Sequence, residues 1–198
     1  REALGIVIEQ MRRLKRIVQD MFLLAQVDSG AFEPTITSFY LEELMGEAVR
    51  AARIIADPLQ VRVDMEAGVE AAVEGDEGLL RQLLLALLDN AIRHTPANGK
   101  VTVRLIPEES VWRVEVADTG TGIPEADRPY IFDRFYRANK ARTREAGGSG
   151  LGLSIAKWIA AMHEGSLTLT ATGPKGTTFT LRLPRRMQRV EGGEGAVG

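Results

Sequence analysis

A heptad pattern near the start of the chain constrains its fold most strongly. Apolar residues recur alternately three and four positions apart with charged residues beside them, and this seam comprises Leu4, Val7, Met11, Leu14, Val18, Met21 and Ala25. The spacing predicts one amphipathic helix over residues 2–28. Neighbouring apolar residues widen the stripe, which favours a four-helix bundle over a two-stranded coil. Asp28-Ser29-Gly30 ends the helix and Pro34 follows, so we expect a domain boundary near residue 30.

The rest of the chain alternates helical segments with strands. Apolar periodicity predicts helices over 41–56, 78–94 and 151–163, and strands over 61–66, 101–105, 111–116, 166–172 and 177–183. Asp76 is the expected N-cap of the second of these helices. This order predicts an α+β fold, a two-layer α/β sandwich whose mixed sheet carries helices on one face. We expect three parts, namely a bundle helix (residues 1–30), one domain (31–186) and a disordered glycine-rich tail (187–198).

Composition argues against several classes of function. The 198 residues carry 25 basic and 27 acidic side chains, a net charge of −2, so no overall positive field attracts nucleic acid. A zinc enzyme is not expected, because the chain has no cysteine and only two histidines. No apolar run approaches the roughly 20 residues of a membrane span, and we expect a cytoplasmic location. The chain begins with Arg1 rather than methionine, and we interpret it as a fragment of a longer protein.

An Asp-Thr-Gly-Thr-Gly turn follows the predicted strand over 111–116. Asp118 comes first in this turn, Gly120 and Gly122 follow, and Ile123 comes directly after them. A carboxylate can accept a hydrogen bond from an exocyclic amine, and glycines let the backbone lie flat against a ring or a phosphate. Adenine is one ligand that fits. Taken alone, the motif is better explained by an ordinary turn, because Asp and Gly are common in turns.

Two further motifs have the chemistry to hold phosphate and a metal ion. Gly147-Gly148-Ser149-Gly150-Leu151-Gly152-Leu153 runs into a predicted helix, whose N-terminus presents backbone N–H groups to an anion. Cations precede it, which either fold over a triphosphate or form a solvated basic loop; they are Arg134, Arg137, Lys140, Arg142 and Arg144. Asn90, near the end of the helix over 78–94, has a carboxamide that can ligate Mg²⁺, and Arg93 can reach phosphate. Taken alone, Asn90 is better explained as a helix-end cap.

Taken together and in this order, the motifs resemble those of bacterial two-component sensor histidine kinases. Leu-Leu-Asp-Asn90-Ala-Ile-Arg-His-Thr-Pro resembles the N box, Asp118-Thr-Gly-Thr-Gly-Ile-Pro the G1 box, Ile131-Phe-Asp-Arg-Phe-Tyr-Arg the F box, and Gly148-Ser-Gly-Leu-Gly-Leu-Ser-Ile-Ala-Lys the G2 box. Residues 1–30 resemble the second helix of the family's dimerisation hairpin. The resemblance implies the Bergerat ATP-binding fold, which type II topoisomerases, a heat-shock chaperone family and mismatch-repair ATPases share.

The resemblance also assigns roles to individual residues. It implies that Asn90 binds Mg²⁺, that Arg93 lies near the phosphates, and that these two act in catalysis. It implies that Asp118 accepts the adenine amine and that His94 forms part of the wall beside the nucleotide. The remaining nucleotide-binding residues that it implies are Gly120, Gly122, Ile123, Phe132, Gly148, Gly150, Leu151, Gly152 and Thr177. Phe132 and Phe135 would anchor a lid over about 132–148, of which residues 137–148 are expected to be mobile without nucleotide.

The activity implied by the resemblance is that of a protein-histidine kinase. The γ-phosphate of ATP passes to a histidine on the first hairpin helix, and then to an aspartate in the receiver domain of a response regulator. That histidine is absent from this sequence, so the fragment is expected to bind ATP and Mg²⁺ without phosphorylating itself. The implied parent protein is a homodimer through its helical hairpin, and it meets a membrane only through an upstream region.

One departure from the family pattern narrows the alternatives. Ala86 lies one turn before Asn90, where many relatives carry a second asparagine and the hydrolytic relatives carry a catalytic glutamate. Without a carboxylate there, the topoisomerase, chaperone and mismatch-repair branches are disfavoured. Two alternatives stay open, which are a degenerate nucleotide-binding interaction module and a serine kinase of the anti-sigma-factor type.

Overall fold

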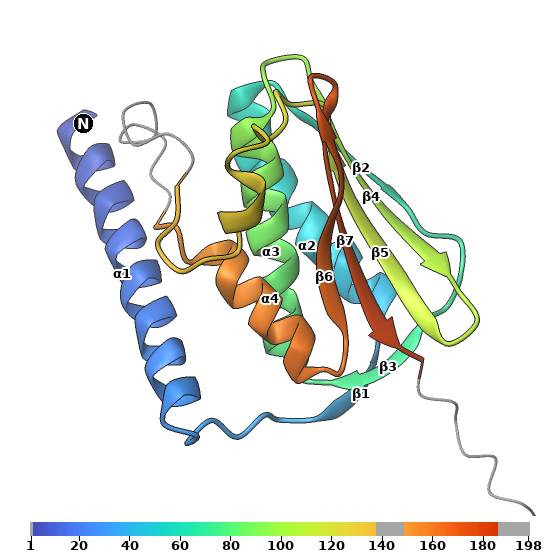
Figure 1. Cartoon of the computed structure of the whole chain (residues 1–198). Helices are drawn as coiled ribbons and strands as arrows, with labels where there is room; N and C mark the ends of the chain where they lie inside the picture. Colours follow the sequence, from blue (N-terminus) through green and yellow to red (C-terminus); the bar gives the residue numbers. More distant parts are fainter. Residues whose placement is uncertain (1, 138–148, 186–198) are drawn as a thin grey trace, which may run out of the picture.

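The computed structural model describes residues 2–137 and 149–185 (Figure 1). The helices are α1 (Glu2–Asp28), α2 (Leu41–Ala56), α3 (Glu77–His94) and α4 (Gly152–Met162), with 3₁₀ turns η1 (Asp57–Leu59) and η2 (Arg128–Tyr130). The strands are β1 (Thr37–Tyr40), β2 (Arg62–Glu66), β3 (Ala72–Gly75), β4 (Lys100–Pro107), β5 (Val111–Asp118), β6 (Ser166–Gly173) and β7 (Gly176–Pro184). Helices α2, α3 and α4 cover one face of the main sheet, which confirms the predicted sandwich, and α1 stands beside them.

The main sheet is mixed, as predicted. Its five strands lie in the order β2-β4-β5-β7-β6. Strand β2 runs parallel to β4, and every other neighbouring pair is antiparallel. Because a parallel pair needs a crossover connection, the chain between β2 and β4 crosses over through α3. Helix α3 is therefore held across the sheet, with its C-terminal end near the loop that follows β5.

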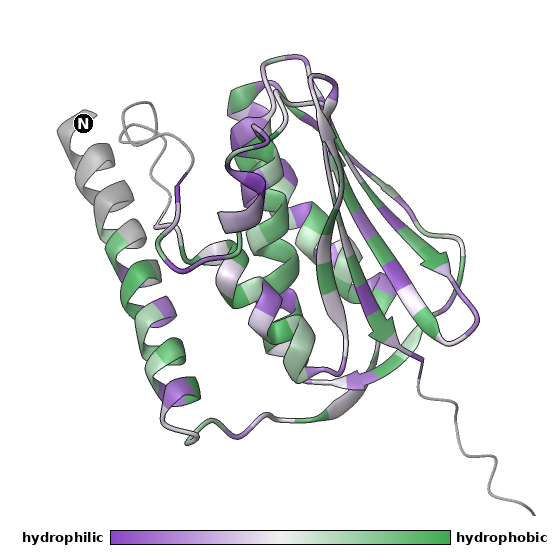
Figure 2. Ribbon diagram, in the orientation of Figure 1, coloured by the Kyte–Doolittle hydropathy of each residue, from purple (hydrophilic) through white to green (hydrophobic). Residues whose placement is uncertain are grey.

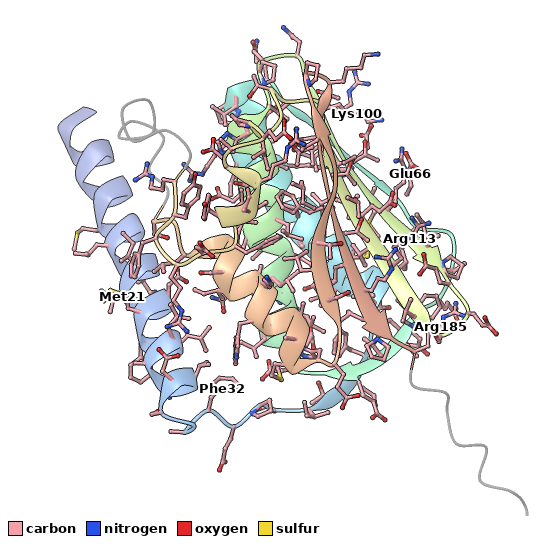
Figure 3. All side chains as sticks on the ribbon, in the orientation of Figure 1. Met21, Phe32, Glu66, Lys100, Arg113 and Arg185 are labelled. Atoms are coloured by element: carbon pink, nitrogen blue, oxygen red, sulfur yellow. The ribbon has the colours of Figure 1, made fainter. Side chains whose placement is uncertain are left out.

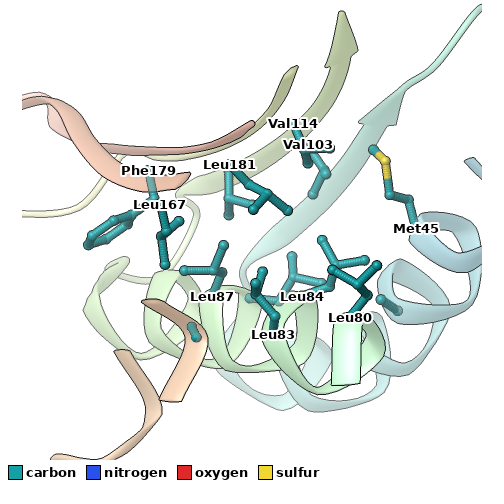
Figure 4. Packing of buried hydrophobic residues seen from close by; sticks show 14 of the residues in the cluster. Met45, Leu80, Leu83, Leu84, Leu87, Val103, Val114, Leu167, Phe179 and Leu181 are labelled. Carbon is teal, nitrogen blue, oxygen red and sulfur yellow. The ribbon is translucent and has the colours of Figure 1, made fainter. Parts of the chain in front are cut away.

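The hydrophobic core lies between this sheet and the helix layer. Alternate residues of β4, β5 and β7 are buried in the core, and Figure 2 shows hydrophobic and hydrophilic residues alternating along the strands of the sheet. Figure 4 shows leucines of α3 packed against side chains from four strands; the labelled residues are Met45, Leu80, Leu83, Leu84, Leu87, Val103, Val114, Leu167, Phe179 and Leu181. Leu83 and Leu87 are 0% exposed, so truncating either to Ala would destabilise the fold by about 2–5 kcal/mol.

Helix α1 leaves its heptad seam uncovered. The large side chains of the described part of the seam, each more than half exposed, are Met11, Leu14, Val18 and Met21, and Ala25 is exposed as well. Figure 3 shows Met21 on the side of α1 that faces away from the sheet. A different face, through Leu23 and Leu24, is buried against the rest of the chain. Within the described ranges, no helix combines the length and apolar character that a membrane span requires.

The predicted helices agree with the structure to within one residue at each end, and the predicted strands agree to within two. Asp76 caps α3 as expected, because its Oδ1 accepts a hydrogen bond from the Leu79 N–H at 3.0 Å. One antiparallel pair, β1 with β3, was not predicted. The predicted tail over 187–198 and residues 138–148 of the predicted lid lie outside the described residues.

Candidate functional site

Asp118 ends strand β5 with its side chain on the core face. Trp112, Val114 and Val116 precede it at alternate positions and are buried, so the strand period of two turns Asp118 inward as well. It is 8% exposed. Burial raises the pKa of its carboxyl group above the ordinary 3.8, and hydrogen bonds from the backbone counteract part of the rise. A buried carboxylate needs hydrogen-bond donors, because an unpaired buried charge is costly.

Two backbone donors reach the same carboxylate oxygen. The Gly120 N–H donates to Oδ1 of Asp118 at 2.7 Å, and the Thr177 N–H donates to the same atom at 3.2 Å. Among residues 2–137 and 149–185, no donor is bonded to Oδ2 of Asp118. One oxygen thus holds the turn to strand β7, and the other is left to accept a hydrogen bond from a ligand.

Two threonines extend this network. Thr177 is buried, and its Oγ1 lies 3.3 Å from Oγ1 of Thr172 on β6. Thr172 Oγ1 also accepts the Ile123 N–H at 2.8 Å. The predicted residues Thr177 and Ile123 are therefore linked through a residue that sequence reasoning missed. The sequence did offer a signal for Thr172. It is a β-branched polar residue that faces Thr177 across the predicted turn over 173–176.

The glycines of the Asp-Thr-Gly-Thr-Gly turn are required by backbone packing. A Cβ on Gly120 would overlap the carbonyl oxygen of His94, at the end of α3. Gly122 has φ +75°, and a Cβ there would overlap the carbonyl of Gly173. Gly176, which the sequence analysis did not single out, has φ +126° and lies against the Asp118 carbonyl. These close approaches fix the loop around the Asp118 carboxylate.

The C-terminal half of α3 carries the predicted metal and phosphate residues. Its core-facing positions are occupied by leucine, alanine and isoleucine, so Asn90 falls beside them and is half-buried. No described residue is hydrogen-bonded to the Asn90 carboxamide. Arg93 is held by its neighbour one turn earlier, since its Nε donates to Asp89 Oδ2 at 2.8 Å.

His94 is the last residue of α3, and its imidazole is close enough to Asp118 for the two charges to interact. Its side chain is exposed at the surface, yet partial desolvation lowers the pKa of the imidazole below 6.5. The negative charge of Asp118 raises the pKa of His94, and the positive charge of Arg93 lowers it further. A lowered pKa favours the uncharged form of the ring.

The glycine-rich loop reaches α4 through Gly150 and Leu151; Gly148 lies outside the described residues. Gly150 has φ +76°, and its carbonyl accepts the Phe135 N–H at 2.9 Å. The Leu151 side chain is 0% exposed, so any contact of this residue with a ligand is made by its backbone. Gly152 opens α4, and a Cβ there would have ordinary contact with Ala86 of α3 at 3.8 Å.

The two phenylalanines expected to anchor the lid behave differently. Phe132 is half-buried and packs edge-on against Phe179 of β7, with ring centroids 6.1 Å apart. Lys157 Nζ lies 5.0 Å from the centre of the Phe132 ring. Phe135 is 61% exposed and has φ +63°, so the expectation that its ring anchors a lid in the core is wrong. Its backbone, bonded to Gly150, makes the connection instead.

Three elements therefore meet at one site: the end of α3, the end of β5 and the start of α4. Direct contacts join His94 to Gly120, Asp118 to Thr177, and Ala86 to the position of Gly152. A buried hydrogen-bond acceptor lies at one end of the site, and the N-terminus of a helix lies at another. Such a combination can recognise an amine-bearing ring and an anionic group together.

Comparisons with known proteins agree on one family. A family model described as "Histidine kinase-, DNA gyrase B-, and HSP90-like ATPase" matches residues 75–187. The chain is 36% identical over 183 residues to the sensor histidine kinase RppB of Synechocystis sp., covering 91% of this chain and 40% of RppB. It is 33% identical over 178 residues to the sensor-like histidine kinase SenX3 of Mycolicibacterium smegmatis, covering 90% of this chain and 46% of SenX3.

The fold comparison gives the same result. Full-length ShkA, solved in complex with AMPPNP, superposes with a TM-score of 0.75 at 26% identity, covering 86% of this chain and 35% of ShkA. The chain spans less than half the length of each of these relatives.

Proposed function

Because the chain belongs to the family of histidine kinase-, DNA gyrase B- and HSP90-like ATPases, we propose that it binds ATP through Asp118 and donates the γ-phosphate to a histidine outside this sequence. The main supporting observation concerns the Asp118 carboxylate. Its Oδ1 accepts both backbone hydrogen bonds, which leaves Oδ2 to accept a hydrogen bond from a ligand. The relatives with which it aligns are sensor histidine kinases, which favours this function over an interaction-only module or an anti-sigma-factor kinase.

Adenine recognition follows from the geometry of Asp118. An ionised carboxylate is an acceptor only, so Oδ2 selects a purine that presents an amine rather than a carbonyl oxygen. Gly120, Gly122 and Ile123 form the loop beside it, and the bond from Ile123 to Thr172 holds that loop in place. His94, at the end of α3, would form part of the wall beside the nucleotide. Phe132, which packs against Phe179, would support the nucleotide site from the core side.

The phosphates would lie toward the start of α4. The backbone of Gly150, Leu151 and Gly152 leads into the helix N-terminus, which favours an anion. Arg93 would supply a cation from α3. The family pattern also places Gly148 near the phosphates, but this residue lies outside the residues that the structure describes.

Magnesium fits this arrangement through one protein ligand. The described residues contain no group of three acidic or histidine side chains that could hold a metal by themselves. Mg²⁺ in nucleotide enzymes keeps several waters and binds phosphates, so one carboxamide oxygen from Asn90 is sufficient. When bound, the ion would neutralise charge on the phosphates. The Asn90 carboxamide makes no hydrogen bond within the described part of the chain, so no side-chain contact has to break.

Phosphoryl transfer requires positioning more than reactive protein groups. An imidazole nitrogen of the acceptor histidine would form a bond to the γ-phosphorus as the bond to the ADP oxygen breaks. The residues of this chain would hold the nucleotide in line for that attack. Ala86, one turn before Asn90, offers no carboxylate to activate water, so transfer to histidine is favoured over hydrolysis.

Helix α1 would be the second helix of the dimerisation hairpin, with residues 31–186 as the catalytic domain. Its exposed seam supports this assignment, because four large apolar side chains on one helix face require a partner in water. The partners in the parent protein would be a second copy through the hairpin and the receiver domain of a response regulator. Any membrane attachment would come from a region outside this sequence, which leaves this part in the cytoplasm.

Calorimetric titration of the chain with AMPPNP, with and without Mg²⁺, tests the proposal. Wild type should bind, magnesium should strengthen binding, and Asn90→Ala should remove the magnesium effect while keeping the metal-free affinity. Asp57→Asn, a charge loss at an exposed carboxylate on η1, serves as a control. Absence of AMPPNP binding in wild type, with the fold intact by circular dichroism, would leave the interaction-only alternative.

A further inference from the structure

The last turns of α1 dock on the catalytic domain through a small interface. Leu23 and Leu24 are buried there, and Phe32, just after the helix, packs edge-on against Trp158 of α4 with ring centroids 5.3 Å apart. Asp20 is 7% exposed and faces Gln82 of α3, whose Nε2 lies 3.4 Å from Oδ1. The interface covers only this end of α1, while the heptad seam stays exposed, so α1 can dock without using the surface that a second helix would cover.

A bidentate ion pair closes this interface at its outer edge. Arg134 Nη1 and Nη2 donate to the two carboxylate oxygens of Asp28 at 2.7 and 2.8 Å, across 106 positions of sequence. The Arg134 guanidinium lowers the pKa of Asp28, and Asp28 raises the pKa of Arg134. Both side chains are about half exposed. The pair is therefore worth little energy on its own and is sensitive to salt.

Arg134 also adjoins the glycine-rich loop. The next residue, Phe135, donates its N–H to the Gly150 carbonyl at 2.9 Å. The two backbones are so close that a Cβ on Gly150 would lie 2.8–3.0 Å from Phe135 and Tyr136 backbone atoms. Phe135 and Gly150 both have positive φ, which this local arrangement imposes. A continuous path thus runs from Asp28 through Arg134 and Phe135 to Gly150.

We propose that the Asp28–Arg134 pair couples the docking of α1 to the phosphate end of the nucleotide site. With α1 docked, Arg134 holds Phe135 in place, and Phe135 holds the Gly150 backbone in the conformation that leads into α4. With α1 undocked, that support is lost and the loop binds phosphate less well. This inference rests on the proposed function, because it takes the ligand of the loop to be ATP phosphate.

Thermodynamic linkage makes the coupling reciprocal. If docking strengthens nucleotide binding by some factor, bound nucleotide must strengthen docking by the same factor. An exposed ion pair can supply a change of about two- to fivefold in affinity. The effect should shrink as salt is raised toward about 0.5 M, because the pair is screened there.

The test is a titration of the whole chain with AMPPNP and, separately, with adenosine. Asp28→Asn and Arg134→Gln should each weaken AMPPNP binding by about two- to fivefold and leave adenosine binding unchanged. The double exchange Asp28→Arg with Arg134→Asp should restore AMPPNP affinity. Glu33→Gln, a charge loss at an exposed residue after α1, is the matched control and should change neither ligand.

Hydrogen exchange gives the reciprocal measurement. AMPPNP should slow exchange of amides in the last turns of α1 in wild type but not in Arg134→Gln. Stronger AMPPNP binding by Asp28→Asn would overturn the proposal, because it would mean that Asp28 keeps Arg134 away from the phosphates. Unchanged binding in both single variants would also overturn it. If wild type binds neither ligand, the proposed function itself is wrong, and that outcome is distinct from a normal affinity without coupling.

Discussion

Replacing Asp118 with Asn separates the role of this residue in the fold from its role in binding. The two backbone donors, Gly120 N–H and Thr177 N–H, both point at one oxygen of the side chain. An amide at this position must turn its oxygen toward them, since the opposite orientation would set its NH₂ group against two N–H donors. The NH₂ group then occupies the place of Oδ2. The Asp118→Asn variant would therefore present a donor to the adenine amine.

The expected loss of affinity follows from this change. A hydrogen bond to a charged acceptor contributes about 1.5–3 kcal/mol, and an adenine amine that faces another donor loses a further 1–3 kcal/mol, roughly. Adenosine and AMPPNP should therefore bind the variant with a loss of about 3 kcal/mol or more, roughly a hundredfold. Inosine carries a carbonyl in place of the amine. It should lose much less, because the new donor can meet that carbonyl.

Stability should move in the other direction. Burial raises the pKa of Asp118, so folding is penalised progressively as pH rises through the ordinary value and the group ionises at a cost. Asn keeps both backbone hydrogen bonds and has no such penalty. At neutral pH the variant should be at least as stable as wild type, measured by urea unfolding. Adenosine binding as tight as that of wild type by an equally stable variant would refute the assignment of Asp118 to the adenine amine.

Three further predictions concern the surroundings of the site. Gly122→Ala should reduce the free energy of unfolding by roughly 2–4 kcal/mol, since its φ is positive and its Cβ would overlap a carbonyl, whereas Gly173→Ala, which has open space, should change it by less than about 0.5 kcal/mol. His163→Ala should destabilise by about 1–3 kcal/mol in thermal unfolding without altering nucleotide affinity, because His163 Nε2 accepts the Asp76 N–H at 2.9 Å at the start of α3. His94 has a lowered pKa, so the stability it contributes is present above pH 6.5 and is lost as pH falls through the lowered value; His94→Gln should show a smaller loss of Tm between about pH 7 and about pH 5 than wild type.

Periodicity predicted the parts of the fold that are dominated by burial. The leucines of α3 and the alternating strands β4, β5 and β7 follow their periods because one face of each is buried in the same core. The four-residue strands β1 and β3 escaped prediction for the opposite reason. The β1 residues are mostly exposed, and their pairing depends on partners more than 30 positions away, such as Phe39 with Val73. Local sequence carries little information about such a pair.

The candidate site divides in the same way. Asp118 could be predicted from its place at the end of a strand, in phase with Val116. Gly176 could not, because the need for glycine there comes from the Asp118 carbonyl, 58 positions earlier in the chain. The exposure of Phe135 also depends on tertiary structure, since its backbone conformation is set by the bond to Gly150. A motif thus identified the residues of the site, but not which of them are held by contacts between distant elements.

The different surroundings of the two Asp118 oxygens explain how a buried carboxylate can remain available to a ligand. Were both oxygens bonded to the protein, binding adenine would require breaking a native hydrogen bond, and the gain would largely cancel. Were neither bonded, the charge would be too costly to bury. In the structure, only Oδ1 is satisfied by the protein, through the N–H groups of Gly120, just after β5, and Thr177, the second residue of β7. Because Gly176 brings the start of β7 against the Asp118 carbonyl, the same close approach that closes the sheet also prepares the binding site.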